Sequence, residues 1–329
     1  MRIGHSDNIG SNTVTDGLID TINNIMQYGN VAVNSKDTTI CEFNDAFVVE
    51  CSVGIDIPYM CAFNNEAVKK VSPKFALAEA AYILQGRDDC NIIDNFPFME
   101  RYKQSGIMIG AYGPYFKKQL SNTIHRLMCD PTTRQAVIAV WPIDDDFRRS
   151  RSCVDVPCTN YFAFYIDRIA GYNVLNMTVV HRSSDVLLGL MYDIVFQQLL
   201  LQTVALFLDD VYLGTITNIA VNRHIYLDGS GIYSLNNVDD DDNIRDIRAI
   251  ALDKKTFSFV DFINVEVFNK QNEAHDFFSV RESIKDLFNS ISHKNVNLVI
   301  HKIMSKLYKS AIDGSYKKYL YENNWEGKK

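Results

Sequence analysis

The chain has 329 residues, of which 47% are hydrophobic and 22% charged. This composition excludes a disordered chain, a collagen and a coiled-coil rod. Its 33 lysines and arginines against 40 aspartates and glutamates give a formal net charge of -7, so a broad electrostatic grip on DNA or RNA is not expected. An anionic ligand must then be bound by a local cluster of arginines.

The seven cysteines are scattered and show neither CxxC nor Cys/His ligand spacing, which predicts free thiols in a reducing compartment. The sequence shows no apolar segment of signal-peptide type near residue 1 and no run of 18 apolar residues. We therefore expect a cytoplasmic protein with no membrane partner.

The first hundred residues contain two predicted helices around one extended stretch. Apolar residues at helical spacing over 16–28 predict a helix that ends at a C′ glycine, Gly29. Residues 38–52 are rich in β-branched and aromatic side chains and are expected to be extended. Ser72, followed by a proline, predicts the N-cap of a helix that ends at Gly86.

The middle of the chain alternates strands with one apolar helix. Strands are predicted over 134–141, 160–166 and 172–181, and another extended stretch over 211–226. Residues 189–207 are apolar on nearly all sides, which predicts a helix buried in the centre of the protein.

The last hundred residues differ in character. The four aspartates at 239–242 stand among Asn and Ser, which favours a solvated loop over a metal site. Ser279 and Glu282 have capping-box spacing before an apolar face, and a second amphipathic helix follows over 299–308. The lysine-rich segment beyond Ser315 is expected to be solvated. We expect a catalytic domain over 1–268 and a helical extension over 269–329.

The candidate chemistry is concentrated in a series of short motifs. Cys158 follows a proline at the entry of a predicted strand. Three further motifs follow it: His181-Arg182-Ser183-Ser184-Asp185, then Gly189 with Asp193 four residues on, and then His224 with Tyr226. Three motifs precede it: Glu79-Ala-Ala-Tyr82-Ile-Leu-Gln-Gly86, Gly110-Ala-Tyr112-Gly113 and Asp130-Pro-Thr-Thr-Arg134.

In this order, the motifs resemble those of the thymidylate synthase superfamily over roughly residues 16–230. The resemblance implies an α+β fold with a mixed β-sheet, flanking helices and, here, a C-terminal helical appendage. It also implies a pyrimidine nucleoside monophosphate substrate, 5,10-methylenetetrahydrofolate as cosubstrate, and a homodimer with shared active sites.

A cysteine is needed because C5 of a pyrimidine is a poor nucleophile. A thiolate that adds at C6 turns the ring into an enolate or enamine, whose C5 can attack a one-carbon electrophile. A free thiol has a pKa of about 8.5, so we expect Arg182 to supply the positive charge that favours the thiolate of Cys158. The other six cysteines are expected to be buried and inert.

The resemblance assigns roles residue by residue. It places the nucleotide phosphate on Arg134, Arg182 and Ser183, the ribose on His224 and Tyr226, and a water and proton relay on Glu79. Further contacts are implied for Tyr112, Gly189 and Asp185 with the nucleotide, and for Tyr82 and Asp185 with the folate. No metal is expected.

The chain also departs from the family pattern. Gln135 replaces a second phosphate-binding arginine, and Lys36 stands loosely where an N-terminal arginine is usual. Arginines at 148, 149 and 151 either compensate or form a solvated basic loop. Thr159, Ala163 and His181 replace a His, a Gln and a Gln, and His181 is interpreted as an interior histidine with satisfied hydrogen bonds.

Asp193 carries the prediction of substrate, because thymidylate synthases have Asn at this position. A carboxylate can accept a hydrogen bond from the 4-amino group of cytosine, and Asp here marks the cytidylate hydroxymethylases of the superfamily. A dipole-favoured Asp at the start of a helix is the structural alternative.

We therefore expect a transferase that converts dCMP or CMP to the 5-hydroxymethyl nucleotide with methylenetetrahydrofolate and water, in the cytoplasm of a bacterial or phage-infected cell. The alternatives are a thymidylate synthase, a dUMP hydroxymethylase, or a non-catalytic nucleotide-binding regulator.

Overall fold

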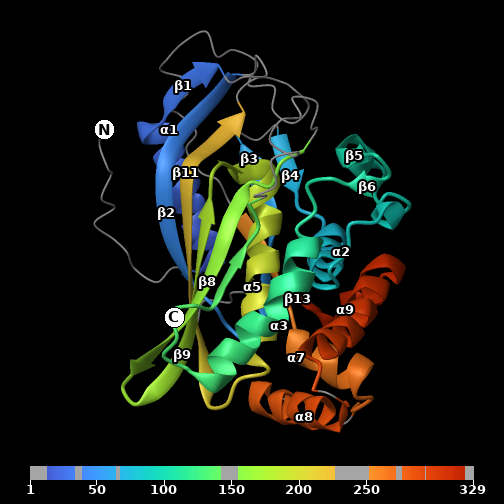
Figure 1. Cartoon of the computed structure of the whole chain (residues 1–329). Coiled ribbons are helices and arrows are strands. Elements are labelled where there is room, and N and C mark those ends of the chain that lie inside the picture. The colour runs from blue at the N-terminus through green and yellow to red at the C-terminus, as the bar shows by residue number, and fades with distance from the viewer. Residues whose placement is uncertain are drawn as a thin grey trace.

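The computed structural model describes residues 13–33, 39–63, 67–141, 155–226, 252–271, 276–292 and 294–322 (Figure 1). Several residues considered above lie outside the described part: Lys36, Arg148, Arg149, Arg151, Cys153, the aspartates at 239–242 and the side chain of Cys61.

The larger sheet is mixed, as predicted. Its strands are β1 (Asn30–Val33), β2 (Thr39–Glu50), β11 (Val211–Tyr226), β9 (Tyr172–His181), β8 (Thr159–Ile169) and β7 (Val137–Ala139), in that spatial order, with β10 (Ser184–Asp185) beside β11. Strand β11 is parallel to β9 and β10, whereas the other pairs are antiparallel. All five predicted extended stretches therefore lie in one sheet. The turn at Gly171 has a φ of 89°, where glycine has no Cβ penalty.

A second sheet was not predicted. It has the order β13 (Leu320–Glu322), β12 (Leu252–Phe257), β3 (Ile55–Phe63) and β4 (Ala67–Lys70), and the short pair β5 (Lys103–Gln104) and β6 (Ile107–Met108) stands apart from both sheets. The prediction that the segment beyond Ser315 is solvated is wrong for the described residues. There, Tyr316 and Tyr319 are buried in a 3-10 turn, and β13 pairs with β12.

The helices of the N-terminal half begin and end close to the predicted residues. Helix α1 (Val14–Tyr28) ends before Gly29, but the φ of Gly29 is -69°, so it is not a left-handed cap. Its role is close approach, because a Cβ there would lie 2.6 Å from Cys41 Sγ. Helix α2 (Pro73–Leu84) begins at Ser72, whose Oγ accepts from the Phe75 N–H at 3.2 Å.

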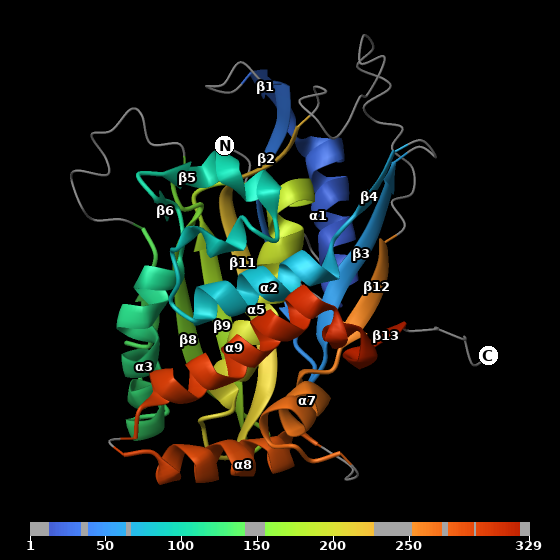
Figure 2. The same cartoon turned by 90° about the vertical axis from the view of Figure 1, so that its right-hand side faces the viewer.

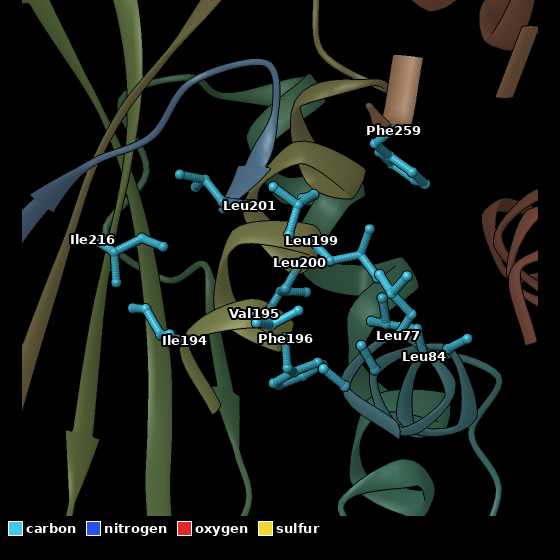
Figure 3. Close-up of a cluster of buried hydrophobic side chains, with 14 of the residues drawn as sticks. Leu77, Leu84, Ile194, Val195, Phe196, Leu199, Leu200, Leu201, Ile216 and Phe259 are labelled. Carbon is cyan, nitrogen blue, oxygen red and sulfur yellow. The ribbon is translucent and has the colours of Figure 1, made fainter. Parts of the chain in front are cut away.

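Helix α5 (Met191–Ala205) forms the centre of the protein, as its apolar composition predicts. Figure 3 shows Ile194 on the side of Ile216 in β11, with Leu77 and Leu84 of α2 on the opposite side. A π-helical turn, η3 (Val186–Leu190), leads into α5. Among the described helices, the segment Val186–Ala205 is long and apolar enough to cross a membrane by composition, but 78% of its window is buried inside the protein, as in a core helix.

The C-terminal helices pack onto this core (Figure 2). Helix α9 (Val296–Asp313) packs against α2 and α3 (Gly113–Cys129), and α8 (Phe277–Ser290) contacts α9. The predicted capping box is wrong by one turn, because the N-cap is Asp276 and Ser279 is its N3 partner. The extension shares one hydrophobic core with residues before 268, and a domain boundary at 268 stays a prediction. The described chain also contains the short helices α7 (Phe259–Phe262), η1 (Cys90–Ile92), η2 (Pro97–Tyr102) and η4 (Ile263–Val267).

Candidate active site

The pairing of β8 with β9 places a cation beside the candidate nucleophile. The Arg182 N–H donates to the carbonyl of Cys158 at 2.9 Å, directly where the two strands meet. The guanidinium of Arg182 turns back toward the same loop, donating to the carbonyls of Pro157 at 3.0 Å and Val156 at 2.9 Å. Its Nη2 lies 3.7 Å from Cys158 Sγ. The structure thus brings together the thiol and the arginine that the sequence singled out.

The charge balance at Cys158 differs from the sequence-based expectation. Burial raises the pKa of this thiol above its usual range, the Arg182 guanidinium lowers it, and nearby carboxyl groups, chiefly that of Asp193, raise it. Arg182 acts in the expected direction but does not outweigh burial. The thiol, rather than the thiolate, is therefore the stable form at neutral pH, and a proton acceptor is needed when Cys158 attacks.

The remaining cysteines divide by environment. Cys41 and Cys51 are buried, as predicted for inert thiols, and Cys90 is half-buried. Cys129 is exposed, so the prediction of a buried residue is wrong there. It is the last residue of α3, where the amphipathic pattern no longer reports burial.

Two half-buried carboxyl groups face the same site, Glu79 from α2 and Asp193 from the first turn of α5. Burial raises the pKa of Glu79 to about 8, with further increases from the charges of Asp193 and Asp155. Burial also raises the pKa of Asp193 to about 7, against a lowering by Arg223 and with a smaller increase from Asp185. At neutral pH Glu79 is therefore mainly protonated, and Asp193 is poised between its two forms.

The residues assigned to the ribose lie around the end of β11. Strand β10 pairs with β11 so that Asp185 is in register with His224. The His224 ring meets Tyr226 edge-on with centroids 5.1 Å apart, and its Nδ1 lies 3.5 Å from Ser183 Oγ. Burial lowers the pKa of His224, so a neutral imidazole faces the site. The structure thus brings together the four residues Ser183, Asp185, His224 and Tyr226, as the sequence motifs predict.

Asp185 and Gly189 shape the wall next to Asp193. Asp185 Oδ1 accepts from the backbone N–H groups of Leu187 and Leu188, both at 3.0 Å, and so caps η3. Among the described residues, apart from its chain neighbours and the nearby backbone of its own helix, a Cβ on Gly189 would come within 4 Å of Asp193 Oδ2 alone, at 3.9 Å. The position is therefore open toward the site, which suits a residue that a planar ring approaches closely.

Tyr112 and Tyr82 have different surroundings. The Tyr112 hydroxyl donates to Thr159 Oγ1 at 3.1 Å and accepts from the Thr159 N–H at 3.2 Å, next to Cys158. Tyr82 is 3% exposed, and its hydroxyl donates to the Asp89 carbonyl at 2.7 Å. The predicted contact of Tyr82 with a folate stays a prediction that none of these contacts supports.

Arg134 is exposed just before β7. Gln135, which replaces the second arginine, accepts a hydrogen bond from Arg126 of α3. The contact of Arg134 with a partner's site stays a prediction.

His181 is an interior residue, as predicted. It is 0% exposed; its Nδ1 pairs with Thr159 Oγ1 at 3.0 Å, and its Nε2 lies 3.3 Å from Gln197 Nε2 and 3.2 Å from Asn218 Nδ2. Burial, with a further contribution from the Arg223 charge, lowers the pKa of His181 to about 3, so the ring is neutral.

Sequence reasoning missed Arg223. This residue is 0% exposed, donates from Nη2 to Asn218 Oδ1 at 2.9 Å, and places Nε 3.5 Å from Asp45 Oδ2. Its guanidinium lies 4.9 Å from the ring centroid of Phe47. The available signal was an arginine inside the extended stretch predicted over 211–226.

Comparison with known proteins identifies the family. The family profile described as thymidylate synthase matches residues 18–238, which is most of the chain. The chain belongs to the thymidylate synthase family. A solved structure, the thermostable thymidylate synthase A of Bacillus subtilis, matches with a TM-score of 0.51 and 20% identity, covering 65% of this chain and 80% of that one. This match confirms the thymidylate synthase-like α+β fold.

Curated relatives of the family match shorter segments. A deoxyuridylate hydroxymethyltransferase of Pseudomonas phage M6 is 32% identical over 130 residues, covering 37% of this chain and 36% of its own. A second, of Bacillus phage SP01, is 26% identical over 182 residues, covering 50% and 46%. A thymidylate synthase of Mycoplasma mobile is 25% identical over 132 residues, covering 40% and 43%. The matched segments thus span less than half of each relative.

Proposed function

We propose that this protein transfers a hydroxymethyl group to C5 of a pyrimidine nucleoside monophosphate, with dUMP as the first candidate substrate. The observation that carries the proposal is the Cys158 thiol 3.7 Å from the Arg182 guanidinium, in a site with two carboxyl groups of raised pKa. The names of the two phage relatives support dUMP over the dCMP expected from the sequence. The balanced reaction is dUMP plus methylenetetrahydrofolate plus water, giving 5-hydroxymethyl-dUMP and tetrahydrofolate.

In this proposal Cys158 is the nucleophile and Glu79 is the acid. Cys158 adds through sulfur to C6 of the base as its thiol proton passes to a neighbouring water, and Arg182 stabilises the negative charge that develops on sulfur. After water has added to the one-carbon unit on C5, the sulfur is expelled from C6 and takes up a proton again. Glu79, protonated at neutral pH, donates a proton toward the O4 edge of the ring or to a water beside it, and then accepts the proton that leaves C5.

The site also fits the folate cosubstrate in one respect. Asp185 is a half-buried carboxyl group at the start of η3, and a carboxylate accepts paired N–H donors such as those of a pterin ring. The missing side chain at Gly189 leaves room next to Asp193. Tetrahydrofolate would supply the one-carbon unit when bound.

Asp193 does not exclude uracil. A protonated carboxyl group can donate to O4 and accept from N3–H, as the amide of Asn does, and a pKa of about 7 makes this form available. The same protonated group can accept from the 4-amino group of cytosine and donate to N3. Cytidylate hydroxymethylation is therefore the second candidate, and Asp193 is the observation that favours it.

The test is incubation of the protein with methylenetetrahydrofolate and, separately, dUMP, UMP, dCMP and CMP, followed by mass measurement of the products. We expect 5-hydroxymethyl-dUMP as the main product. A 5-methyl product would replace the proposal by thymidylate synthesis, and turnover of cytidylates alone would establish the second candidate. Asp193→Asn should keep dUMP turnover and lose most of any cytidylate turnover, because an amide can donate a hydrogen bond to cytosine N3 but cannot transfer a proton to it when Cys158 adds at C6.

The exposed position of Arg134 leads to a prediction about the homodimer that the family implies. Arg134→Ala and Cys158→Ser subunits should each be inactive alone, but mixing them should restore about a quarter of normal activity, because half of the dimers then contain one intact site. Subunit exchange is verified with tagged chains. If exchanged dimers recover no activity, Arg134 does not serve the partner's site.

A further inference from the structure

Arg223 owes its buried position to an irregularity in strand β11. The pairing of β11 with β2 runs from Asn218↔Phe47 to Ala220↔Asp45, and then shifts register before Arg223↔Phe43. In a regular strand, alternation from Asn218 and Ala220 would send the side chain of Arg223 to the opposite face. The bulge redirects it inward, and bulges with this effect are common next to active sites.

A hydrogen-bonded chain connects Arg223 to the helix that carries Asp193. Arg223 Nη2 donates to Asn218 Oδ1 at 2.9 Å, and Asn218 Nδ2 donates to Gln197 Oε1 at 2.9 Å. Gln197 is four residues after Asp193 in α5, so both side chains lie on one helix face. The buried cation therefore lies against the face of α5 that presents the carboxyl group.

Arg223 also fixes the direction of the hydrogen bonds that lead to Tyr112. Because an arginine can only donate, Asn218 must turn its oxygen to Arg223 and its amino group to Gln197 and His181. His181 Nε2 then accepts, which leaves the hydrogen on Nδ1 to be donated to Thr159 Oγ1. Thr159 in turn holds the Tyr112 hydroxyl.

The guanidinium is incompletely neutralised within the described residues. Its Nε and Nη1 make no hydrogen bond there, and Asp45 approaches only to 3.5 Å. A buried cation with spare donors acts strongly on a nearby carboxyl group because the local dielectric is low. The charge of Arg223 lowers the pKa of Asp193, and burial lowers that of Arg223 itself to about 10.

We propose that Arg223 is a positioning residue that controls how readily Asp193 takes up the proton it needs to pair with a pyrimidine base. The base-binding part of this inference rests on the proposed function. An ionised carboxylate places one oxygen against a lone pair of either base, O4 of uracil or N3 of cytosine, whereas the protonated group makes two hydrogen bonds with either. Nucleotide binding should therefore weaken as the pH rises through the titration of Asp193.

Other groups act on Asp193 from the elements around it. Glu79 lies on α2, Tyr112 at the start of α3, Cys158 at the entry of β8 and Asp185 in β10, and each interacts electrostatically with Asp193. Each of them is neutral or negative at neutral pH. The positive charge of Arg223 therefore opposes burial and Asp185, and its removal should favour the protonated form.

The first measurement is the carboxyl ¹³C titration of Asp193, followed by NMR in selectively labelled protein and assigned by its disappearance in Asp193→Asn. Arg223→Gln should move the midpoint upward by about one pH unit, equal to about a tenfold change in proton affinity. Asp45→Asn, which leaves the guanidinium without its counter-charge, should move it downward. Arg223→Lys keeps the charge and should stay closest to the unaltered protein.

The second measurement is the affinity for dUMP and dCMP from about pH 5.5 to about pH 8.5. The midpoint of the affinity profile should follow the same order among the variants and vanish in Asp193→Asn. An unchanged carboxyl titration in folded Arg223→Gln, or shifts of one sign in both Arg223→Gln and Asp45→Asn, overturns the inference. If the titrations shift as expected but no pyrimidine nucleotide binds at any pH, the proposed function fails and the electrostatic role of Arg223 stands.

Discussion

Cys158→Ser should bind dUMP with nearly normal affinity and lose turnover by about 10³-fold or more. The serine hydroxyl is a much weaker nucleophile at neutral pH, and Arg182 cannot lower its pKa far enough to compensate. Binding should persist because Arg182 is held by the carbonyls of Val156 and Pro157, not by the Cys158 side chain. Rapid-quench turnover and equilibrium dialysis of the same preparation measure the two effects.

Cys129→Ser is the matched control, because Cys129 is an exposed thiol at the end of α3. It should keep full activity. A thiol-specific reagent should inactivate the unaltered protein and the Cys129→Ser variant alike, and dUMP should protect both. Near-normal turnover in Cys158→Ser, or equal losses in both variants, would assign the nucleophile elsewhere.

Periodicity predicted most of the fold because long elements leave strong patterns. The all-round apolar segment at 189–207 became the buried α5, and the extended stretch at 211–226 coincides with β11. The N-cap signal of a serine followed by a proline also placed the start of α2 correctly at Ser72. Each of these signals depends on residues close together in the sequence, which is why it is visible without a structure.

The predictions that failed did so because two local signals competed or because the deciding contacts are distant in sequence. Ser279 and Glu282 have cap spacing, but Asp276 forms the N-cap three residues earlier with Ser279 as its partner. The segment after Ser315 is polar in sequence, yet β12 supplies a strand that it can pair with. A Cβ on Gly29 would clash with the Ile25 carbonyl oxygen and lie 2.6 Å from Cys41 Sγ, and the second of these contacts, between α1 and β2, cannot be anticipated by a turn rule.

In the candidate site, too, the sequence located the residues that carry local motifs and missed the features that depend on contacts distant in sequence. Motif order was sufficient to bring Cys158, Arg182, Ser183 and His224 together, because each stands at a strand end in the same sheet. Motif reasoning could not find Arg223, because its inward direction comes from a register shift between β11 and β2. It also could not give the raised pKa of Asp193, which depends on burial by the whole fold.

Glu79→Gln should lower kcat by about 10²–10⁴-fold while nucleotide affinity changes little. The amide keeps the size of the side chain and can still donate a hydrogen bond, but it cannot transfer a proton. Glu79 titrates in the folded protein near pH 8, because burial and the charges of Asp193 and Asp155 favour its protonated form. If this form is the acid, kcat of the unaltered enzyme should be sustained below that pH and fall as the pH rises through about 8.

Glu79→Asp is the matched comparison, because it keeps an acid but shortens its reach by one methylene. It should retain more activity than Glu79→Gln and keep an alkaline decline in kcat, whereas the residual activity of Glu79→Gln should lack that decline. Steady-state kcat across the pH range, with dUMP and methylenetetrahydrofolate saturating, separates the two. Near-normal kcat in Glu79→Gln would show that the proton is handled by another group. An alkaline decline that survives in Glu79→Gln would assign the titration to a different residue, with Asp193 the first to examine because burial raises its pKa to about 7.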